Sequence, residues 1–266
     1  MGTLLLVHAH PDDEAISTGG AMMKAKGEGH RVVLVTSTRG EAGEIYNMDE
    51  KATRPHLGEV RTKELETAAK ILGVDRLEFL GYRDSGMVGT RENEDPRSYH
   101  QAPLDEAAAK LAAILREERP DVVVTYDADG TYGHPDHIKA HHVTNAALDV
   151  LEKEGWRPSK VYYTAIPRSL MEKFMEQVPE EDRRNDTIRI IGTPDELVTT
   201  RVEVSDFVDR KREAFAAHVT QNDPNSWFTT MADQMYRMAF GTEYYRLARG
   251  NPSGELPEPD LFEGIR

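Results

Sequence analysis

Four short apolar runs, three of which contain β-branched residues, constrain the fold of this chain of 266 residues more than any other feature. The runs are residues 3–8, 31–36, 76–80 and 121–126. The segments between them carry apolar residues at helical spacing, as in residues 57–72 and 104–115. Strands that alternate with helices predict right-handed βαβ units. We therefore expect a Rossmann-like α/β fold, with a mostly parallel sheet and helices on both faces.

The alternation weakens beyond about residue 160. We expect four further elements there: strands at residues 160–166, 200–204 and 243–248, and a helix at 207–218. Residues 1–165 are therefore expected to form the catalytic core. Residues 166–266 are expected to form a smaller C-terminal lobe that completes the substrate pocket within one integrated domain.

Charge and composition exclude several classes of function. The 33 Lys and Arg against 47 Asp and Glu give a net charge of −14, which argues against binding a nucleic-acid backbone. No apolar run approaches the roughly 20 residues of a membrane span. The N-terminus turns acidic after a short apolar run and has no basic leader, so we expect a cytoplasmic protein. The expected partner is a small molecule, and a homo-oligomer is compatible with the sequence.

Polar residues follow the first and the fourth predicted strand, as residues 10–14 (HPDDE) and 132–137 (YGHPDH). Ligands of such sheets bind at the carboxyl ends of the strands, so both segments are expected at one site. The chain has no cysteine, and any metal must take nitrogen and oxygen ligands. Two imidazoles and one carboxylate form an N,N,O set typical of catalytic zinc. The Asp of the pair that does not bind the metal can accept a proton from a water that the metal activates.

Other residues near these segments have competing interpretations. His141 follows His137 by four residues and is an alternative ligand, although the glutamate of the zincin pattern is absent. His8 faces the opposite side of its strand from the residue after it, so we expect it to pack behind the ligands. Asp127 and Asp129 resemble part of a calcium loop but lack its 12-residue series, which favours a simple loop turn.

The two polar segments resemble a known pair of signatures. Residues 9–14 (AHPDDE) and 134–137 (HPDH) are similar to those of the zinc-dependent N-acetylglucosaminyl deacetylase superfamily, the LmbE-like or PIG-L family, over at least residues 3–150. Further segments resemble its mycothiol branch, namely residues 40–44, 83–87, 125–127, 217–221 and 261–265. That branch contains the N-acetylglucosaminyl-inositol deacetylase and the mycothiol S-conjugate amidase.

The resemblance implies a hydrolase that removes the N-acetyl group from an N-acetylglucosaminyl glycoside by attack of a zinc-bound water on the amide. His10, Asp13 and His137 would be the zinc ligands, and Asp12 the general base. Ferrous iron is the alternative metal for such an N,N,O set.

Three further catalytic roles follow from the same resemblance. His134 would be the acid that protonates the leaving amine, and Asp136 would orient it. Tyr132 would hydrogen-bond the developing oxyanion.

The resemblance also implies residues that bind the substrate. Three residues of this chain stand at positions where members of the branch contact the sugar or the inositol: Arg61, Asp84 and Glu44. A salt bridge of Arg61 with Glu64 or Glu66 on its own helix is the alternative. At the position of Ser17 the amidase typically carries a lysine, whereas the deacetylase carries a serine. This difference favours deacetylation.

Other functions compete with N-acetylglucosaminyl-inositol deacetylation. Within the family they are mycothiol S-conjugate hydrolysis and deacetylation of another N-acylated amino sugar. A nucleotide-binding Rossmann protein needs a Gly-rich turn after the first strand, where this chain has two adjacent acids that repel phosphate. A dinuclear metal phosphoesterase would use Asp127 and Asp129 in addition to Asp12 and Asp13. A relative that binds without catalysis is the last alternative.

Overall fold

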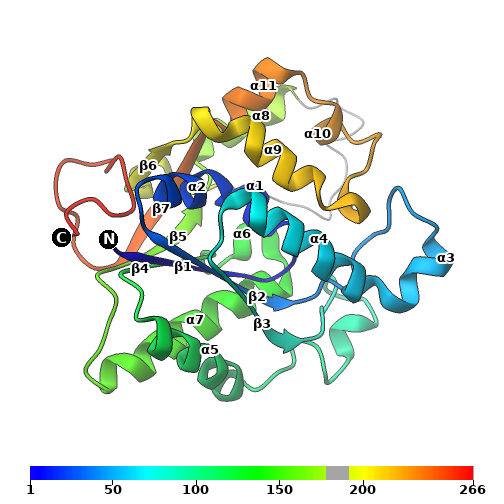
Figure 1. The fold of residues 1–266 in the computed structure, drawn as a ribbon, viewed down its shortest axis with the longest axis horizontal. Helices are drawn as coiled ribbons and strands as arrows, with labels where there is room; N and C mark the ends of the chain where they lie inside the picture. The colour runs from blue at the N-terminus through cyan, green and yellow to red at the C-terminus, as the bar shows by residue number, and fades with distance from the viewer. Residues whose placement is uncertain (178–191, 266) are drawn as a thin grey trace.

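A computed structural model describes residues 1–177 and 192–265 of the chain. Within these residues a seven-stranded sheet has the order β3-β2-β1-β4-β5-β7-β6 (Figure 1). Its strands are β1 (Thr3–His8), β2 (Arg31–Thr38), β3 (Arg76–Tyr82), β4 (Val122–Thr125), β5 (Lys160–Ala165), β6 (Thr200–Glu203) and β7 (Thr242–Arg249). The first five are parallel neighbours, and β7 pairs antiparallel with β5 and β6. The predicted strands and mostly parallel sheet are confirmed.

Helices cover both faces of the sheet, as predicted (Figure 1). One face carries α5 (Leu104–Glu118) and α7 (Pro135–Lys153). The other face carries α1 (Asp13–Ser17), α2 (Gly19–Gly27), α4 (Leu57–Leu72) and α9 (Val208–Ala216). Each face has its own apolar cluster, because alternate residues of β1 point to opposite sides: Leu4 and Leu6 to one, Leu5 and Val7 to the other. Each fully buried side chain of this kind stabilises the fold by about 1.5–3 kcal/mol.

Local signals explain where several helices begin and end. Pro135 is the first residue of α7, where its missing N–H costs no hydrogen bond. Gly73 ends α4 at φ 78, a left-handed conformation that glycine adopts without a steric penalty. The expected helix near residues 207–218 is α9, which is shorter at both ends.

Residues after 165 add β6 and β7 to the sheet of the first half, so both parts of the chain share one sheet. The remaining α-helices are short: α3 (Glu50–Thr53), α6 (Gly130–Gly133), α8 (Arg168–Gln177), α10 (Trp227–Thr230) and α11 (Asp233–Phe240). The 3-10 segments are η1 (Arg54–His56), η2 (Glu92–Glu94), η4 (Asp195–Leu197), η5 (Ser205–Phe207) and η6 (Val219–Gln221). In the described part of the chain, no helix is long and apolar enough to cross a bilayer.

The pairing of β1 with β4 creates the site. Leu4 lies opposite Val122 and Leu6 opposite Val124, in parallel register. The two strands therefore end at the same edge of the sheet. The loop after β1 and the loop that leads into α7 meet there.

Candidate active site

Three side chains that can ligate a metal converge where the two loops meet. The Nδ1 atom of His10 lies 3.3 Å from Nε2 of His137 and 3.5 Å from Oδ2 of Asp13. The Nε2 atom of His137 lies 3.4 Å from Oδ1 of Asp13. A tetrahedral zinc with ligand bonds of about 2.0–2.2 Å holds its ligand atoms about 3.3–3.6 Å apart. The spacing of these three side chains, which we call the ligand triad, therefore fits a small divalent metal.

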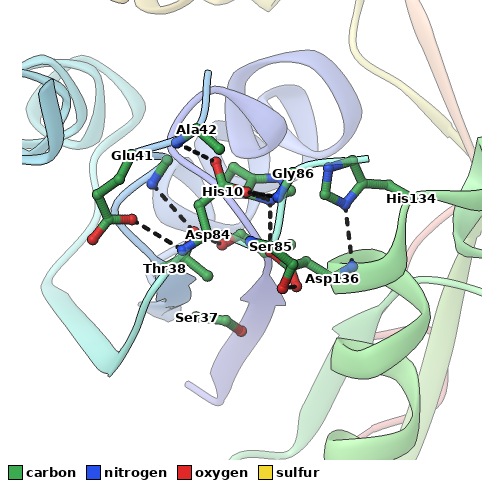
Figure 2. A network of polar contacts seen from close by, with 12 residues as sticks. His10, Ser37, Thr38, Glu41, Ala42, Asp84, Ser85, Gly86, His134 and Asp136 are labelled. Carbon is green, nitrogen blue, oxygen red and sulfur yellow. Dashed lines mark hydrogen bonds and ion pairs between the residues drawn. The ribbon is translucent and has the colours of Figure 1, made fainter. Parts of the chain in front are cut away.

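Carboxylates on the far side of His10 fix the orientation of its ring. Its Nε2 atom lies 3.2 Å from Oδ2 of Asp136 and 3.5 Å from Oδ1 of Asp84 (Figure 2). Ser85 donates its backbone N–H to Asp136 at 2.9 Å and its hydroxyl to the same carboxylate. Burial lowers the pKa of His10, but Asp84, Asp13 and Asp136 outweigh it and raise that pKa well above its ordinary value. Carboxylates in this position hold metal-binding histidines in one tautomer.

Asp13 is held in its ionised form. The Tyr126 hydroxyl donates to its Oδ2 atom at 2.6 Å, and the backbone N–H of His10 donates to the same atom at 2.8 Å. Burial raises the pKa of Asp13, but the two histidines of the ligand triad hold it well below its usual range. His8 lies behind this group, buried, with Nδ1 3.2 Å from the Tyr126 hydroxyl.

Two other groups of possible metal ligands share His10 with the ligand triad. One group is His10, His134 and His137, and the other is His10, Asp84 and Asp136. Nδ1 of His134 accepts the backbone N–H of Asp136 at 3.1 Å, and Asp84 and Asp136 face the opposite nitrogen of His10. The ligand triad brings one carboxylate to two imidazoles, the donor set typical of a catalytic zinc, and we therefore take it as the candidate metal site.

The alternative ligands considered from the sequence point elsewhere. His141 has its Nδ1 atom 3.0 Å from the backbone oxygen of Tyr126. Asp127 accepts the backbone N–H of Thr131 at 3.0 Å, and Asp129 is exposed. Asp127 therefore stabilises a loop turn. The structure gives a second metal ion no carboxylate pair in this loop among the described residues.

Asp12 stands next to the ligand triad in an unusual backbone conformation. Its φ of 114 and ψ of −32 are not helical values, and the helix begins at the next residue, Asp13. Its Oδ2 atom lies 3.1 Å from Nη2 of Arg61, and 20% of its side chain remains exposed. Burial raises the pKa of Asp12 to about 6, against the opposing effect of the Arg61 guanidinium. Asp12 is therefore ionised at neutral pH and can accept a proton.

Arg61 is buried and forms hydrogen bonds with the loop after β1. Besides Asp12, it donates to the backbone oxygens of Pro11 and, at 2.9 Å, Gly40. A Cβ atom on Gly40, which has a φ of +69, would lie 2.0 Å from Nη1 of Arg61. The alternative salt bridge with Glu64 is wrong, because Glu64 instead accepts two hydrogen bonds from Thr220.

His134 and Tyr132 border the ligand triad from the segment just before α7, with Tyr132 in the short helix α6. Burial and the neighbouring rings of His10 and His137 lower the pKa of His134 to about 2, so it is neutral in the free site. Asp136 contacts His134 through its backbone N–H, while the Asp136 carboxylate faces His10. Burial also raises the pKa of Tyr132, which therefore keeps its proton and can donate a hydrogen bond.

The predicted substrate-binding residues lie in different places. Ser17 and Tyr132 line a cavity of about 560 Å³ whose walls continue to apolar residues of α8 and α11. Asp84 is buried beside His10 and accepts the backbone N–H groups of Ala42 at 3.1 Å and Gly86 at 2.9 Å (Figure 2). Glu44 is exposed, on the loop after β2.

Sequence reasoning missed three residues that support the site. Ser85 bonds Asp136, and its position just after β3 was the signal that could have found it. Glu14 and His218 form a buried pair 2.7 Å apart. Glu14 belongs to the first motif, whereas the spacing of His218 carries no signal for this contact.

Comparison with known proteins adds evidence from the whole chain. The model of the GlcNAc-PI de-N-acetylase (PIG-L) family matches residues 5–148. A protein of Acidothermus cellulolyticus named 1D-myo-inositol 2-acetamido-2-deoxy-alpha-D-glucopyranoside deacetylase is 44% identical, over 99% of this chain and 95% of its own. A protein of the same name from Thermobifida fusca is 42% identical, over 97% of this chain and 98% of its own.

Solved structures share the fold at lower identity. The N,N'-diacetylchitobiose deacetylase from Pyrococcus horikoshii has a TM-score of 0.63 and 21% identity, over 99% of this chain and 86% of its own. GalB from Pseudomonas putida, a 4-carboxy-2-hydroxymuconate hydratase, has a TM-score of 0.59 and 19% identity, over 96% of this chain and 100% of its own. A deacetylase and a hydratase thus share this architecture, so the reaction has to be argued from the site.

Proposed function

The chain belongs to the GlcNAc-PI de-N-acetylase (PIG-L) family, and from this premise we propose that it is a metal-dependent hydrolase that removes the N-acetyl group of N-acetylglucosaminyl-inositol. The observation that carries the proposal is the ligand triad, in which the two imidazoles lie 3.3 Å apart and each lies 3.4–3.5 Å from an oxygen of Asp13, with the ionisable Asp12 beside it. The inositol glycoside is chosen because the full-length relatives above are named for it.

The proposed metal is zinc. Two imidazole nitrogens and one carboxylate oxygen are its usual ligands in catalytic sites, and ferrous iron is the alternative. When bound at the ligand triad, the metal supplies Lewis acidity, which polarises the amide carbonyl and lowers the pKa of water to about 7. Among the described residues, Nδ1 of His137 is buried without a hydrogen-bond partner, while its Nε2 atom faces His10 and Asp13.

Asp12 is the proposed general base. It accepts a proton from water as the water oxygen bonds to the amide carbon. Its pKa of about 6 suits this role, because the carboxylate is mostly ionised at pH 7 yet still basic enough to take the proton. The Arg61 guanidinium holds the carboxylate in place.

Tyr132 and His134 are proposed to complete the reaction. The Tyr132 hydroxyl donates to the amide oxygen as negative charge develops there. His134 is neutral in the free site, so Asp12 passes to it the proton taken from water, and His134 transfers that proton to the amide nitrogen. The C–N bond then breaks, the free amine leaves, and the acetic acid formed loses its remaining proton to solvent as acetate.

Exposure separates the four predicted substrate-binding residues into two groups. Arg61 and Asp84 are buried and already bonded to the loops of the site, so they act on the substrate mainly by holding those loops. Glu44 is exposed and Ser17 half-buried, and we propose that they contact the glycoside directly.

The test is release of primary amine from three substrates, by enzyme with one equivalent of zinc per chain. We expect N-acetylglucosaminyl-inositol to be hydrolysed with a higher kcat/KM than N-acetylglucosamine or a mycothiol S-conjugate. Preference for the conjugate would instead identify an amidase, and preference for free N-acetylglucosamine a deacetylase of simpler sugars. The cytoplasmic location and the homo-oligomer stay predictions.

A further inference from the structure

His218 reaches the first motif from the other end of the chain. It lies between α9 and η6, and its Nε2 atom donates to Oε1 of Glu14 at 2.7 Å. Neither side chain has any exposed surface. A buried carboxylate and imidazole in direct contact orient each other strongly, because neither has water as an alternative partner.

The other oxygen of Glu14 holds the proposed base. Its Oε2 atom accepts the backbone N–H of Asp12 at 2.9 Å. Asp12 has a φ of 114, a region that residues with a side chain rarely occupy. Such a conformation persists only where the surroundings hold it. The hydrogen bond from Asp12 to Glu14 is one of the contacts that hold it, and the hydrogen bond from His218 fixes Glu14 in turn.

Hydrogen bonds connect the segment that carries His218 to α4, in the first half of the chain. Thr220 donates its backbone N–H and its hydroxyl to Glu64 of α4, at 2.8 and 2.7 Å. The backbone oxygen of His218 accepts the side chain of Asn222 at 2.8 Å. The backbone that carries the His218 imidazole is therefore fixed, and so is the contact of the imidazole with Glu14.

We propose that His218 is a positioning residue for Asp12: through Glu14 it holds the Asp12 backbone in the left-handed conformation that presents the Asp12 carboxylate beside the ligand triad. This inference rests on the proposed function, in which Asp12 is the base. His218 does not touch the ligand triad itself, so its loss moves the base and leaves the metal site intact.

Two variants with the same chemistry and different reach test the proposal. The amide of His218→Gln extends far enough to donate to Oε1 of Glu14, whereas the amide of His218→Asn is too short. The control is Thr220→Val, which removes a buried hydroxyl bond from the same segment without touching Glu14. Because all three substitutions are small, the folded state of each is checked by its thermal unfolding midpoint.

The first readout is hydrogen exchange of the Asp12 backbone amide, followed by NMR in the full chain. We expect slow exchange in the wild type and in His218→Gln, and exchange at least about tenfold faster in His218→Asn. Thr220→Val is expected to lower the unfolding midpoint while the Asp12 amide stays protected. Equal exchange in His218→Gln and His218→Asn, or a fast amide in the wild type, would overturn the proposal.

The second readout is steady-state kinetics with zinc content measured in parallel. We expect His218→Asn to lose at least about tenfold in kcat, with KM within about twofold and one zinc per chain, and His218→Gln to recover most of kcat. An unchanged kcat in a folded His218→Asn variant would contradict the positioning role. Absence of deacetylation by the wild type would instead overturn the proposed function, and the exchange experiment would still decide whether His218 orders Asp12.

Discussion

Nδ1 of His10 and Nε2 of His137 lie 3.3 Å apart, although 127 residues separate them in the sequence. The parallel pairing of β1 with β4 brings them together, because His10 follows β1 closely and His137 lies on the helix that the loop after β4 leads into. Asp13 completes the ligand triad.

Removing one ligand of the triad should abolish metal binding. We expect His10→Ala to hold less than about a tenth of the zinc that the wild type holds after dialysis, because a site with two ligands keeps little of the affinity of a site with three. The control is His141→Ala, since His141 contacts Tyr126 outside the triad. Zinc content is read by atomic emission. A His10→Ala protein with a full equivalent of zinc would show that the metal binds elsewhere.

Removing the base should separate catalysis from metal binding. We expect Asp12→Asn to keep one zinc per chain and to lose at least about 10²-fold in kcat, the usual contribution of a general base. The amide is isosteric with the carboxylate and can still accept a hydrogen bond from Arg61, so the fold should be retained. Turnover at the wild-type rate would show that another group takes the proton.

The acid role of His134 can be distinguished from simple hydrogen bonding. A glutamine can donate a hydrogen bond but cannot pass on a proton. If His134 protonates the leaving amine, His134→Gln and His134→Ala should both lose about 10²–10⁴-fold in kcat. The measurement is steady-state kinetics on one substrate. A His134→Gln enzyme that keeps most of its kcat would assign His134 the role of a neutral donor.

A buried ion pair far from the site makes stability depend on pH. Nζ of Lys160 lies 2.8 Å from Oε2 of Glu258, and both side chains are almost fully buried. Burial raises the pKa of Glu258, but Lys160 and Ser253 outweigh it, so the folded-state pKa is lowered. This stabilisation is therefore complete above the ordinary glutamate pKa of 4.5 and is lost as the pH falls through the lowered folded value.

We expect Glu258→Gln to reduce the free energy of unfolding by about 3 kcal/mol at pH 7, because Lys160 stays buried without its charged partner. The difference from the wild type should shrink as the pH falls below about 4.5. Urea unfolding at a series of pH values measures it. A difference that stays constant down to pH 3 would show that the Glu258 charge contributes little.

Most of the fold could be predicted from local patterns. The four apolar runs became β1 to β4, since a short apolar run between turn residues is typical of a buried strand. The ligand triad could be proposed because its members follow two strands that end at one edge of the sheet. The helices α8 and α11 were missed, because the only helix expected in the second half was the one near residues 207–218.

Contacts that depend on the packing of distant segments were not predictable. Arg61 has Glu64 one helical turn away, the pattern of a local salt bridge, yet it is buried against Asp12. The hydrogen bond of Glu14 with His218 joins residues 204 positions apart. No spacing rule links them, because their contact exists only once α9 has packed against α1.

One measurement tests the central claim most directly: the acetate and the primary amine released from N-acetylglucosaminyl-inositol by the metal-free protein, by the same protein with one equivalent of zinc, and by zinc-loaded Asp12→Asn. The account predicts that zinc-loaded wild type releases both products in equal amounts, and that the metal-free protein and the zinc-loaded variant are each at least about 10²-fold slower. Equal rates with and without zinc, or amine without acetate, would contradict it.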